Sequence, residues 1–161
     1  FKKLMIRTGI GYDAHQLGVN YPLIIGGVKI PSKKGSIGHS DGDVLSHCIV
    51  DAMLGSLSLG DIGKYFPSSE KEWKNKSSLF FLHKANELVA NKGYKINNID
   101  STIILQEPQV SNYVEKIIET ISAEIKLSKK YISVKFTTKD RLGFHKNSFG
   151  IEALAIVTVS N

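Results

Sequence analysis

The chain has 161 residues, a formal charge of +6 at neutral pH and one cysteine, Cys48. This length fits one domain, which we predict to span residues 1–161, and a lone cysteine cannot form a disulfide within the chain. The positive charge suits anionic ligands in general, but the basic residues do not alternate with aromatic ones, so nucleic acid is not the expected partner. No apolar run approaches the roughly 18 residues of a membrane span, so no membrane association is expected.

The N-terminal residues Phe1 to Lys3 carry neither the features of a signal peptide nor an initiator methionine. We therefore interpret the chain as a trimmed or mature form that has lost any targeting leader. The compartment expected for it is the cytoplasm if the source is bacterial, and the stroma of a plastid or apicoplast if the source is eukaryotic.

The first half of the chain predicts an opening strand, a hairpin and two helices. Leu4 to Tyr12 reads as the strand, and the apolar, β-branched run from Leu23 to Ile30 as part of the hairpin. Apolar residues recur at helical spacing from Asp43 to Leu57, which predicts the first helix. Residues 61–75 are rich in turn residues and charge and are expected to form a long mobile loop near a site. A second helix is expected from Ser77 to Asn91.

The second half of the chain predicts three strands and one helix. The strands are expected at Ile99 to Leu105, Tyr131 to Thr137 and Ile151 to Val159, and the helix at Val110 to Lys126. The last strand is apolar on both faces, which is typical of a strand covered on both sides. Strands and helices alternate without a strict βαβ order, so the predicted fold class is α+β with a mixed sheet and helices on one face.

Two side chains that commonly bind metals lie two residues apart at the end of the first predicted strand. Asp13 and His15 point to the same face, because alternate residues of a strand share a face. They could therefore share a metal ion. An Asp and a His near a strand end can equally well cap turns, and this pair alone leaves both interpretations open.

A second polar cluster, His39 to Asp43, precedes the first predicted helix. Asp43, His47 and Asp51 then follow at four-residue steps, which places them on one stripe of the helix. Taken alone, this pattern favours a capped polar helix face over a set of metal ligands.

Combining the two clusters gives a different interpretation. Asp13, His15 and His47 together supply one carboxylate and two imidazoles, and three protein ligands with an open fourth position are typical of catalytic zinc. Asp51 would then accept a hydrogen bond from the second ring nitrogen of His47. Spacing in the sequence does not by itself establish that the three ligands converge.

The remaining candidates are weaker. His83 is interpreted as an ordinary packed or surface residue, and His145, in a basic loop, as solvated. Residues Lys135 to Asp140 pass from a strand into a loop, where hydroxyls, amides and a lysine suit phosphate oxygens and Asp140 suits Mg²⁺. A threonine-rich strand end is equally common without such a role.

Five separated motifs occur in order along nearly the whole chain. They are Gly9 to His15; Ile25 to Val28; His39 to Val44 with His47; Leu59 to Lys64 with Phe66 and Pro67; and Thr137 and Thr138 with Leu142 to Phe144. In this combination the sequence resembles the cyclodiphosphate synthase family of the non-mevalonate pathway of isoprenoid biosynthesis. Five motifs in the same order make an accidental match implausible.

The resemblance implies an enzyme, a phosphorus–oxygen lyase that converts 4-diphosphocytidyl-2-C-methyl-D-erythritol 2-phosphate to 2-C-methyl-D-erythritol 2,4-cyclodiphosphate and CMP. The 2-phosphate of the substrate would attack its own β-phosphorus and CMP would leave, so no protein nucleophile is needed. Catalysis would then rest on positioning the internal nucleophile and on neutralising phosphate charge with metal ions and aligned donors.

Two metal sites are implied by the same resemblance. One Zn²⁺ per chain would be bound by Asp13, His15 and His47 and would polarise the β-phosphate. Mg²⁺ or Mn²⁺ would be bound by Asp140 between the α- and β-phosphates. Asp140 stands where the family usually has Glu, so its side chain is one methylene shorter than the usual ligand.

His39 and Thr138 are the implied catalytic residues, and they would stabilise the transition state. The residues implied to bind the methylerythritol and diphosphate parts of the substrate are Ser40, Asp61, Ile62, Gly63, Phe66, Thr137, Lys139 and Phe144. The cytosine would be held, largely through backbone groups, by Leu105, Gln106, Glu107, Pro108, Gln109, Val110 and Ser111. A base that is bound by backbone groups leaves little trace in the side chains.

The implied architecture is a mixed four-stranded sheet with helices on one side, and a homotrimer in which three such sheets pack around a threefold axis. Each active site would lie between subunits and would bind a substrate that carries a cytidine diphosphate group. Two other functions are compatible with the same residues: a zinc-dependent phosphoesterase that uses metal-bound water, and a basic nucleotide- or RNA-binding module with a structural metal.

Overall fold

A mixed β-sheet is the framework of the protein, whose computed structural model describes residues 3–143 and 149–161. Its strands are β1 (Ile6–Val19), β4 (Lys34–Ser36), β5 (Lys95–Leu105), β6 (Ile132–Thr137) and β7 (Gly150–Ser160), in the order β4-β1-β7-β5-β6. The pairing of β5 with β6 is parallel and the other pairings are antiparallel. The predicted α+β class with a mixed sheet is therefore confirmed.

The number of strands in that sheet was predicted wrongly. Four were expected and five are present, because β4 pairs with the far end of β1, where Leu17 lies opposite Ser36 and Val19 opposite Lys34. β4 has only three residues, which is too short for the alternation of apolar and polar residues that marks a strand in a sequence. β1 is also longer than predicted, because it continues through Asp13 and His15 to Val19.

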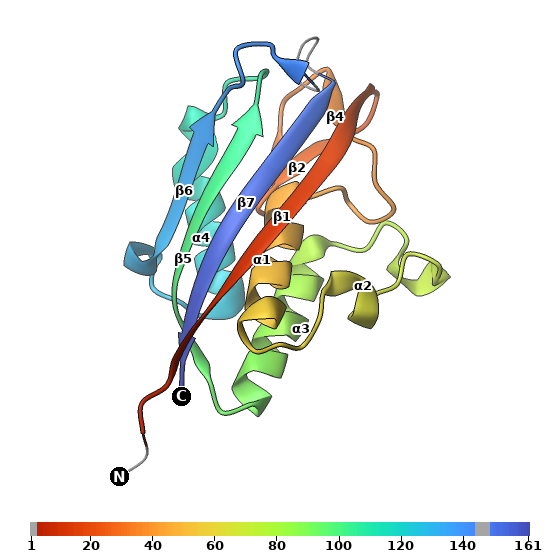
Figure 1. The fold of residues 1–161 in the computed structure, drawn as a ribbon. Coiled ribbons are helices and arrows are strands. Elements are labelled where there is room, and N and C mark those ends of the chain that lie inside the picture. Colours follow the sequence, from red (N-terminus) through yellow and green to blue (C-terminus); the bar gives the residue numbers. More distant parts are fainter. Residues whose placement is uncertain (1–2, 144–148) are drawn as a thin grey trace.

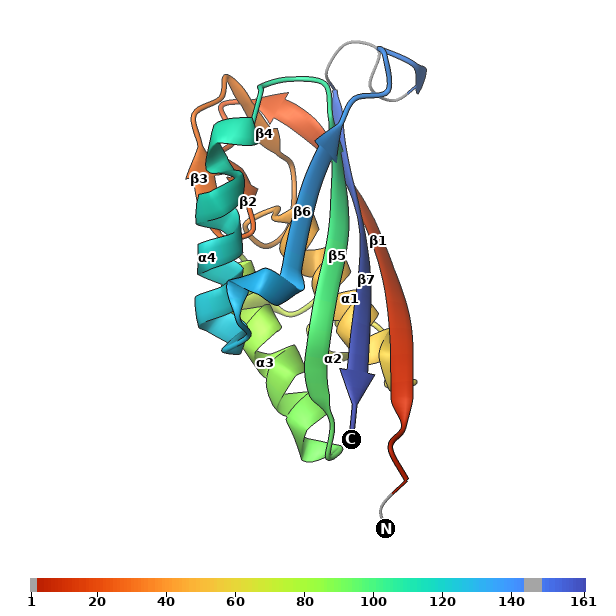
Figure 2. The same ribbon diagram turned by 90° about the vertical axis from the view of Figure 1, so that its left-hand side faces the viewer.

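Helices cover one face of the sheet. They are α1 (Val44–Ser56), α2 (Ile62–Tyr65), α3 (Ser78–Asn91) and α4 (Val114–Ile125), with the short 3₁₀ helices η1 (Lys71–Trp73), η2 (Ser111–Tyr113) and η3 (Lys129–Tyr131). Figures 1 and 2 show α1, α3 and α4 on the same side of the sheet. The three predicted helices are thus confirmed in position, and the segment 61–75 contains α2 and η1 where a loop was expected.

The hairpin predicted around residues 23–30 is also present. β2 (Leu23–Ile25) and β3 (Val28–Ile30) pair with each other in a separate two-stranded sheet. Gly26 and Gly27 connect them with positive φ angles of 56° and 76°. These angles are readily adopted by glycine, which has no Cβ, so the Gly-Gly pair accounts for the tight turn.

α1 packs unusually close to β1. A Cβ atom added to Gly9 would lie 2.0 Å from the carbonyl oxygen of Ala52, and one added to Gly11 would lie 1.8 Å from the carbonyl oxygen of Cys48. Only glycine therefore permits this contact between strand and helix backbones. The contact places the first turns of α1 directly against the stretch of β1 that contains Asp13 and His15.

The opposite face of the sheet carries exposed apolar side chains. On β1, Ile10 is 68% and Tyr12 is 55% exposed, and beside them on β7 Leu154 and Ile156 are 38% and 45% exposed. Large contiguous apolar patches are uncommon on the surface of monomeric proteins and mark interaction surfaces. None of the helices among the described residues has the length and apolarity needed to cross a membrane.

Candidate active site

Three side chains with metal-ligating atoms meet between β1 and α1. Oδ2 of Asp13 lies 3.0 Å from Nε2 of His15 and 3.0 Å from Nδ1 of His47, and the two ring nitrogens are 3.3 Å apart. We call these residues the metal cluster. Within residues 3–143 and 149–161, they are the one group of three or more such side chains close enough to hold an ion. The structure therefore brings together the three ligands that were predicted from separate motifs.

The convergence follows from the packing of α1 on β1. Asp13 and His15 point to the same face as Gly9 and Gly11, and that is the face against which α1 packs. His47 lies in the first turn of α1, which is capped by the buried side chain of Asp43. The Asp43 carboxylate accepts from the backbone nitrogens of Gly26, Gly27 and Ser46. The helix start is thus fixed relative to the hairpin as well as to β1.

The charges in the metal cluster support one another. Burial alone would raise the pKa of the Asp13 carboxyl, but hydrogen bonds from His15 and His47 outweigh burial and hold that pKa well below its usual range. Burial lowers the pKa of His47, but the neighbouring Asp13 carboxylate more than offsets this and raises it. An ionised carboxylate and two imidazoles are a ligand set that suits zinc.

The other ring nitrogen of His47 faces two serines. Nε2 lies 2.8 Å from Oγ of Ser78 and 3.0 Å from Oγ of Ser40. The predicted contact between His47 and Asp51 is not formed, because Oδ1 of Asp51 instead accepts from the backbone nitrogen of Ile62 at 2.7 Å. Asp51 and His47 share a helical stripe, but the carboxylate is directed toward α2.

A cleft of about 270 Å³ opens beside the metal cluster. Its lining residues are His15, His39, Ser40, His47, Ile62, Gly63, Phe66, Ser68, Trp73 and Phe81. Five residues that were predicted to act on the substrate are therefore beside the metal cluster. Asp61, a sixth, is the N-cap of α2, where its Oδ1 accepts from the backbone nitrogen of Lys64.

A second group of predicted residues lies at the end of β6. Residues that line a cleft of about 200 Å³ there are Leu105, Gln106, Pro108, Gln109, Val110, Ser111, Phe136, Thr137 and Thr138. The two segments that form it are linked, since the backbone nitrogen of Arg141 donates to Oε1 of Gln106 at 3.1 Å. We call residues 105–111 and 137–140 together the loop cluster.

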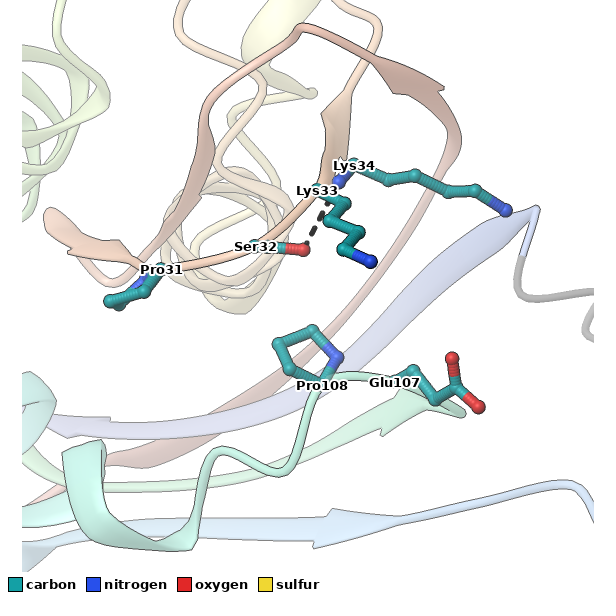
Figure 3. Close-up of a pocket in the computed structure, with 6 residues that line it drawn as sticks. All are labelled: Pro31, Ser32, Lys33, Lys34, Glu107 and Pro108. Atoms are coloured by element: carbon teal, nitrogen blue, oxygen red, sulfur yellow. Dashed lines mark hydrogen bonds between the residues drawn. The ribbon is translucent and has the colours of Figure 1, made fainter.

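Two of the residues predicted to bind the substrate, Glu107 and Lys139, do not line that cleft. Glu107 lines a different cleft of about 530 Å³, in which it and Pro108 face the segment from Pro31 to Lys34 (Figure 3). Nζ of Lys139 donates to Oε1 of the buried Glu152 at 2.7 Å, so this lysine is directed toward the sheet. The predicted contact of Phe144 lies outside the described residues.

Thr137 of the loop cluster lies across the sheet from the metal cluster. Ala14, Glu152, Ile104 and Thr137 lie in register across β1, β7, β5 and β6. Three strand spacings of about 4.8 Å separate the ends of this row by about 14 Å. Thr137 shares its face with Ala14, and it therefore points to the side of the sheet opposite Asp13.

The sequence was compared with models of known protein families, and one of them matches. The model of the YgbB family matches residues 6–160, which is nearly the whole chain. The chain belongs to the YgbB family. A protein of Clostridium kluyveri that is called 2-C-methyl-D-erythritol 2,4-cyclodiphosphate synthase is 52% identical over 156 residues, which cover 97% of this chain and 95% of that protein. A Clostridium botulinum protein with the same name is 50% identical over 151 residues, which cover 94% and 97%.

Solved structures agree with membership of the YgbB family. The CDP complex of IspF from Plasmodium falciparum has a TM-score of 0.84 and 38% identity, and covers 96% of this chain and 95% of that chain. The bifunctional IspDF of Campylobacter jejuni has a TM-score of 0.94 and 36% identity. The alignment with it covers 98% of this chain but 43% of the Campylobacter chain. The resemblance inferred from the five motifs is thus confirmed.

Several residues at the site were not predicted. Trp73 and Phe81 line the cleft, and their rings lie 6.1 Å apart. Ser78 contacts the metal cluster through His47. Trp73 lies in the segment that was expected to be a loop, and Ser78 was predicted only as part of the second helix. Neither residue belongs to a sequence pattern that marks it as part of a site. The unexplained length of segment 61–75 was the one available hint.

Proposed function

We propose that this chain catalyses the conversion of 4-diphosphocytidyl-2-C-methyl-D-erythritol 2-phosphate to 2-C-methyl-D-erythritol 2,4-cyclodiphosphate and CMP. An oxygen of the 2-phosphate forms a bond to the β-phosphorus, and the bond from that phosphorus to the α-phosphate oxygen breaks. The observation that carries the proposal is the metal cluster, placed beside a cleft in a chain whose YgbB-family relatives are named for this product.

Asp13, His15 and His47 are the residues that would hold a zinc ion, one per chain. Their three ligand atoms lie within 4.8 Å of one another, as a common ion requires, and the cleft borders two of the three residues. Zinc bound there would supply positive charge beside the β-phosphate. The chain's own contribution is to direct three ligands inward and to keep the carboxylate of Asp13 ionised.

The residues that line the cleft are proposed to bind the substrate on one side and to exclude water on the other. His39 and Ser40 lie beside the metal cluster and are proposed to donate hydrogen bonds to phosphate and to the methylerythritol hydroxyls. Phe66, Trp73 and Phe81 form an apolar side, in which the rings of Phe66 and Phe81 are 4.6 Å apart. An apolar wall disfavours water at the reacting phosphorus, and this favours attack by the internal phosphate over hydrolysis.

We propose that the loop cluster of a neighbouring subunit completes each site in a homotrimer. Two observations support sharing: Thr137 of the loop cluster lies about 14 Å across the sheet from β1 and points to the face opposite Asp13, and that face carries exposed apolar side chains. Packing these faces around a threefold axis would bury them. A closed cyclic trimer joins unlike patches of adjacent chains.

The loop cluster has the chemistry for a cytidine diphosphate. Backbone groups of residues 105–111 are proposed to hold the cytosine, and Thr137 and Thr138 to contact the diphosphate, with Thr138 stabilising the transition state. Asp140 is proposed to bind Mg²⁺ or Mn²⁺. Solved relatives of the family that are described as CDP complexes support a ligand of this class.

Relatives from both Clostridium and Plasmodium match the chain. The expected compartments, bacterial cytoplasm or the stroma of a plastid or apicoplast, both stay predictions. Two other functions were considered from the sequence: a zinc phosphoesterase and a nucleotide- or RNA-binding module. Neither is favoured, because relatives with 50% and 52% sequence identity are named as cyclodiphosphate synthases.

Product analysis tests the proposed reaction. The purified protein, loaded with zinc and supplied with Mg²⁺, is incubated with the substrate in ¹⁸O-labelled water, and the products are followed by ³¹P NMR and mass spectrometry. We expect CMP and a cyclic diphosphate, neither containing ¹⁸O, because the nucleophile comes from the substrate. A linear phosphate product that contains solvent oxygen would show hydrolysis and would overturn the proposal.

A further inference from the structure

Ser78 connects the metal cluster to a carboxylate that is not part of it. Its side chain is fully buried at the first residue of α3. Oγ of Ser78 contacts Oδ1 of Asp41 and also lies 2.8 Å from Nε2 of His47. Asp41 is held in place by two backbone donors, the nitrogen of Ser78 at 2.8 Å and that of Asp43 at 3.2 Å. Asp41, Ser78 and His47 therefore form a continuous chain of polar contacts.

The donors and acceptors in this chain have one consistent arrangement. An ionised carboxylate can only accept, so the hydroxyl of Ser78 donates to Asp41. A hydroxyl that has donated its single proton offers only lone pairs, so Nε2 of His47 must carry a proton and donate to Ser78. When a metal ion is bound, Nδ1 therefore carries no proton and directs its lone pair to the space between Asp13 and His15, whereas without the metal the same nitrogen donates to Asp13.

We propose that Ser78 and Asp41 are positioning residues that hold His47 in the tautomer with the proton on Nε2, so that Nδ1 serves as the metal ligand. They also fix the ring orientation, because Ser78 is anchored by the backbone at the start of α3. This deepens the proposed function and rests on it in one respect, namely that the metal cluster binds zinc.

Ser40 is the other possible partner of Nε2, at 3.0 Å. It is less suited to the positioning role, because it lines the cleft and is only partly buried, whereas Ser78 lies behind the ring and has its own carboxylate partner. The two serines thus have different tasks. Ser78 holds the imidazole, and the hydroxyl of Ser40 stays available to a ligand in the cleft.

Zinc affinity tests the inference without a measurement of activity. We expect Ser78→Ala to weaken zinc binding about 10- to 100-fold, the range seen when the partner of a metal-ligating histidine is removed. The affinity is measured by competition between the protein and a chromophoric chelator at fixed pH. Ser77→Ala is the matched control: it makes the same change one residue earlier and removes only a cap contact to the nitrogen of Leu79. Its zinc affinity should stay within twofold of the unaltered protein.

A double mutant separates positioning from general loosening of the structure. If Asp41 acts through Ser78, then Asp41→Asn combined with Ser78→Ala should bind zinc no more weakly than Ser78→Ala alone. Effects that instead multiply would show that Asp41 does not act through Ser78.

¹⁵N NMR of the zinc-loaded protein gives a direct signature. We expect a proton on Nε2 of His47 that exchanges slowly with water, and faster exchange in Ser78→Ala. Ligation through Nε2, or zinc affinity of Ser78→Ala equal to that of the unaltered protein, would overturn the inference while leaving the proposed metal cluster intact. Failure of the unaltered protein to bind zinc would overturn the metal assignment and the inference together.

Discussion

The metal cluster lies between β1 and α1 and is enclosed by its own chain, whereas the loop cluster lies at the exposed end of β6, two to three strands away across the sheet. Each ligand of the metal cluster has defined partners, down to the serine behind His47. In the loop cluster, Thr138 and Asp140 are exposed, and Asp140 has a positive φ of 48°. The side chains of the metal cluster are thus held by contacts within one chain, whereas Thr138 and Asp140 of the loop cluster are accessible to a ligand or a neighbouring subunit.

The two halves of the proposed site should therefore respond differently to substitution. Changes in the metal cluster should alter metal content and the stability of the single chain. Changes in the loop cluster should alter ligand and Mg²⁺ dependence and should leave zinc in place.

His47→Ala should abolish stoichiometric zinc binding and reduce activity about 1,000-fold or more, because several kcal/mol of charge stabilisation is lost with the metal. Elemental analysis of the purified protein measures the zinc content. His83→Ala is the control, since His83 is an exposed histidine that pairs with Glu87 and Glu124 and should not affect zinc. Unchanged zinc content in His47→Ala would remove His47 from the ligands.

Gly11→Ala should destabilise the protein by about 3 kcal/mol or more, because the new methyl group would lie 1.8 Å from the backbone oxygen of Cys48 and would push α1 from β1. Chemical denaturation measures the change in the free energy of unfolding. The matched control is Gly55→Ala in α1, where the nearest atom would be 3.8 Å away. That change should stabilise the protein by up to about 1 kcal/mol. Equal effects at both positions would contradict the close packing that forms the metal cluster.

Asp140→Asn should raise the Mg²⁺ concentration needed for half-maximal rate about tenfold, which corresponds to one lost charged contact of about 1.4 kcal/mol. Zinc content should stay the same, because Asp140 belongs to the loop cluster. Titration of the rate with Mg²⁺ at saturating substrate is the measurement. An unaltered Mg²⁺ dependence would show that Asp140 is not a ligand, and Asp140→Glu, the residue usual in the family, should keep the dependence.

Glu152→Gln should have the smallest effect, a loss of about three- to tenfold in kcat/KM, because it releases Lys139 and so loosens the loop that carries Thr138 and Asp140. Steady-state kinetics measure this loss. The double variant Glu152→Gln with Lys139→Met should be no worse than either single variant, since both remove the same ion pair. Strictly additive losses would contradict a role exerted through Lys139.

Much of the architecture was predictable because its signals are local and periodic. α1, α3 and the last strand were found within one or two residues, since apolar spacing marks a covered face, whereas α4 begins four residues later than predicted, after η2. β4 was missed because three residues carry no period. The short helix α2 was missed because its four residues include no buried ones.

The candidate ligands could be named from the sequence, because strand spacing grouped Asp13 with His15, the helix pattern put His47 near a helix start, and the family resemblance joined the two groups. The contacts around them could not be. Asp51 was selected because it lies four residues after His47, but the choice between Asp51 and the pair Asp41 and Ser78 depends on how α3 packs against α1. That packing joins residues 31 positions apart in the sequence, and no local pattern encodes it.

Each active site is proposed to draw its metal cluster from one chain and its loop cluster from another. His47→Ala and Thr138→Ala, each nearly inactive alone, are denatured, mixed in equal amounts and refolded with zinc. If the site is shared and assembly is random, about a quarter of the sites receive two sound halves, and activity rises to about a quarter of that of the unaltered protein. If both clusters act within one chain, every site keeps one lesion. No recovery of activity, in a sample whose mixed trimers are demonstrated by native mass spectrometry, would contradict the claim.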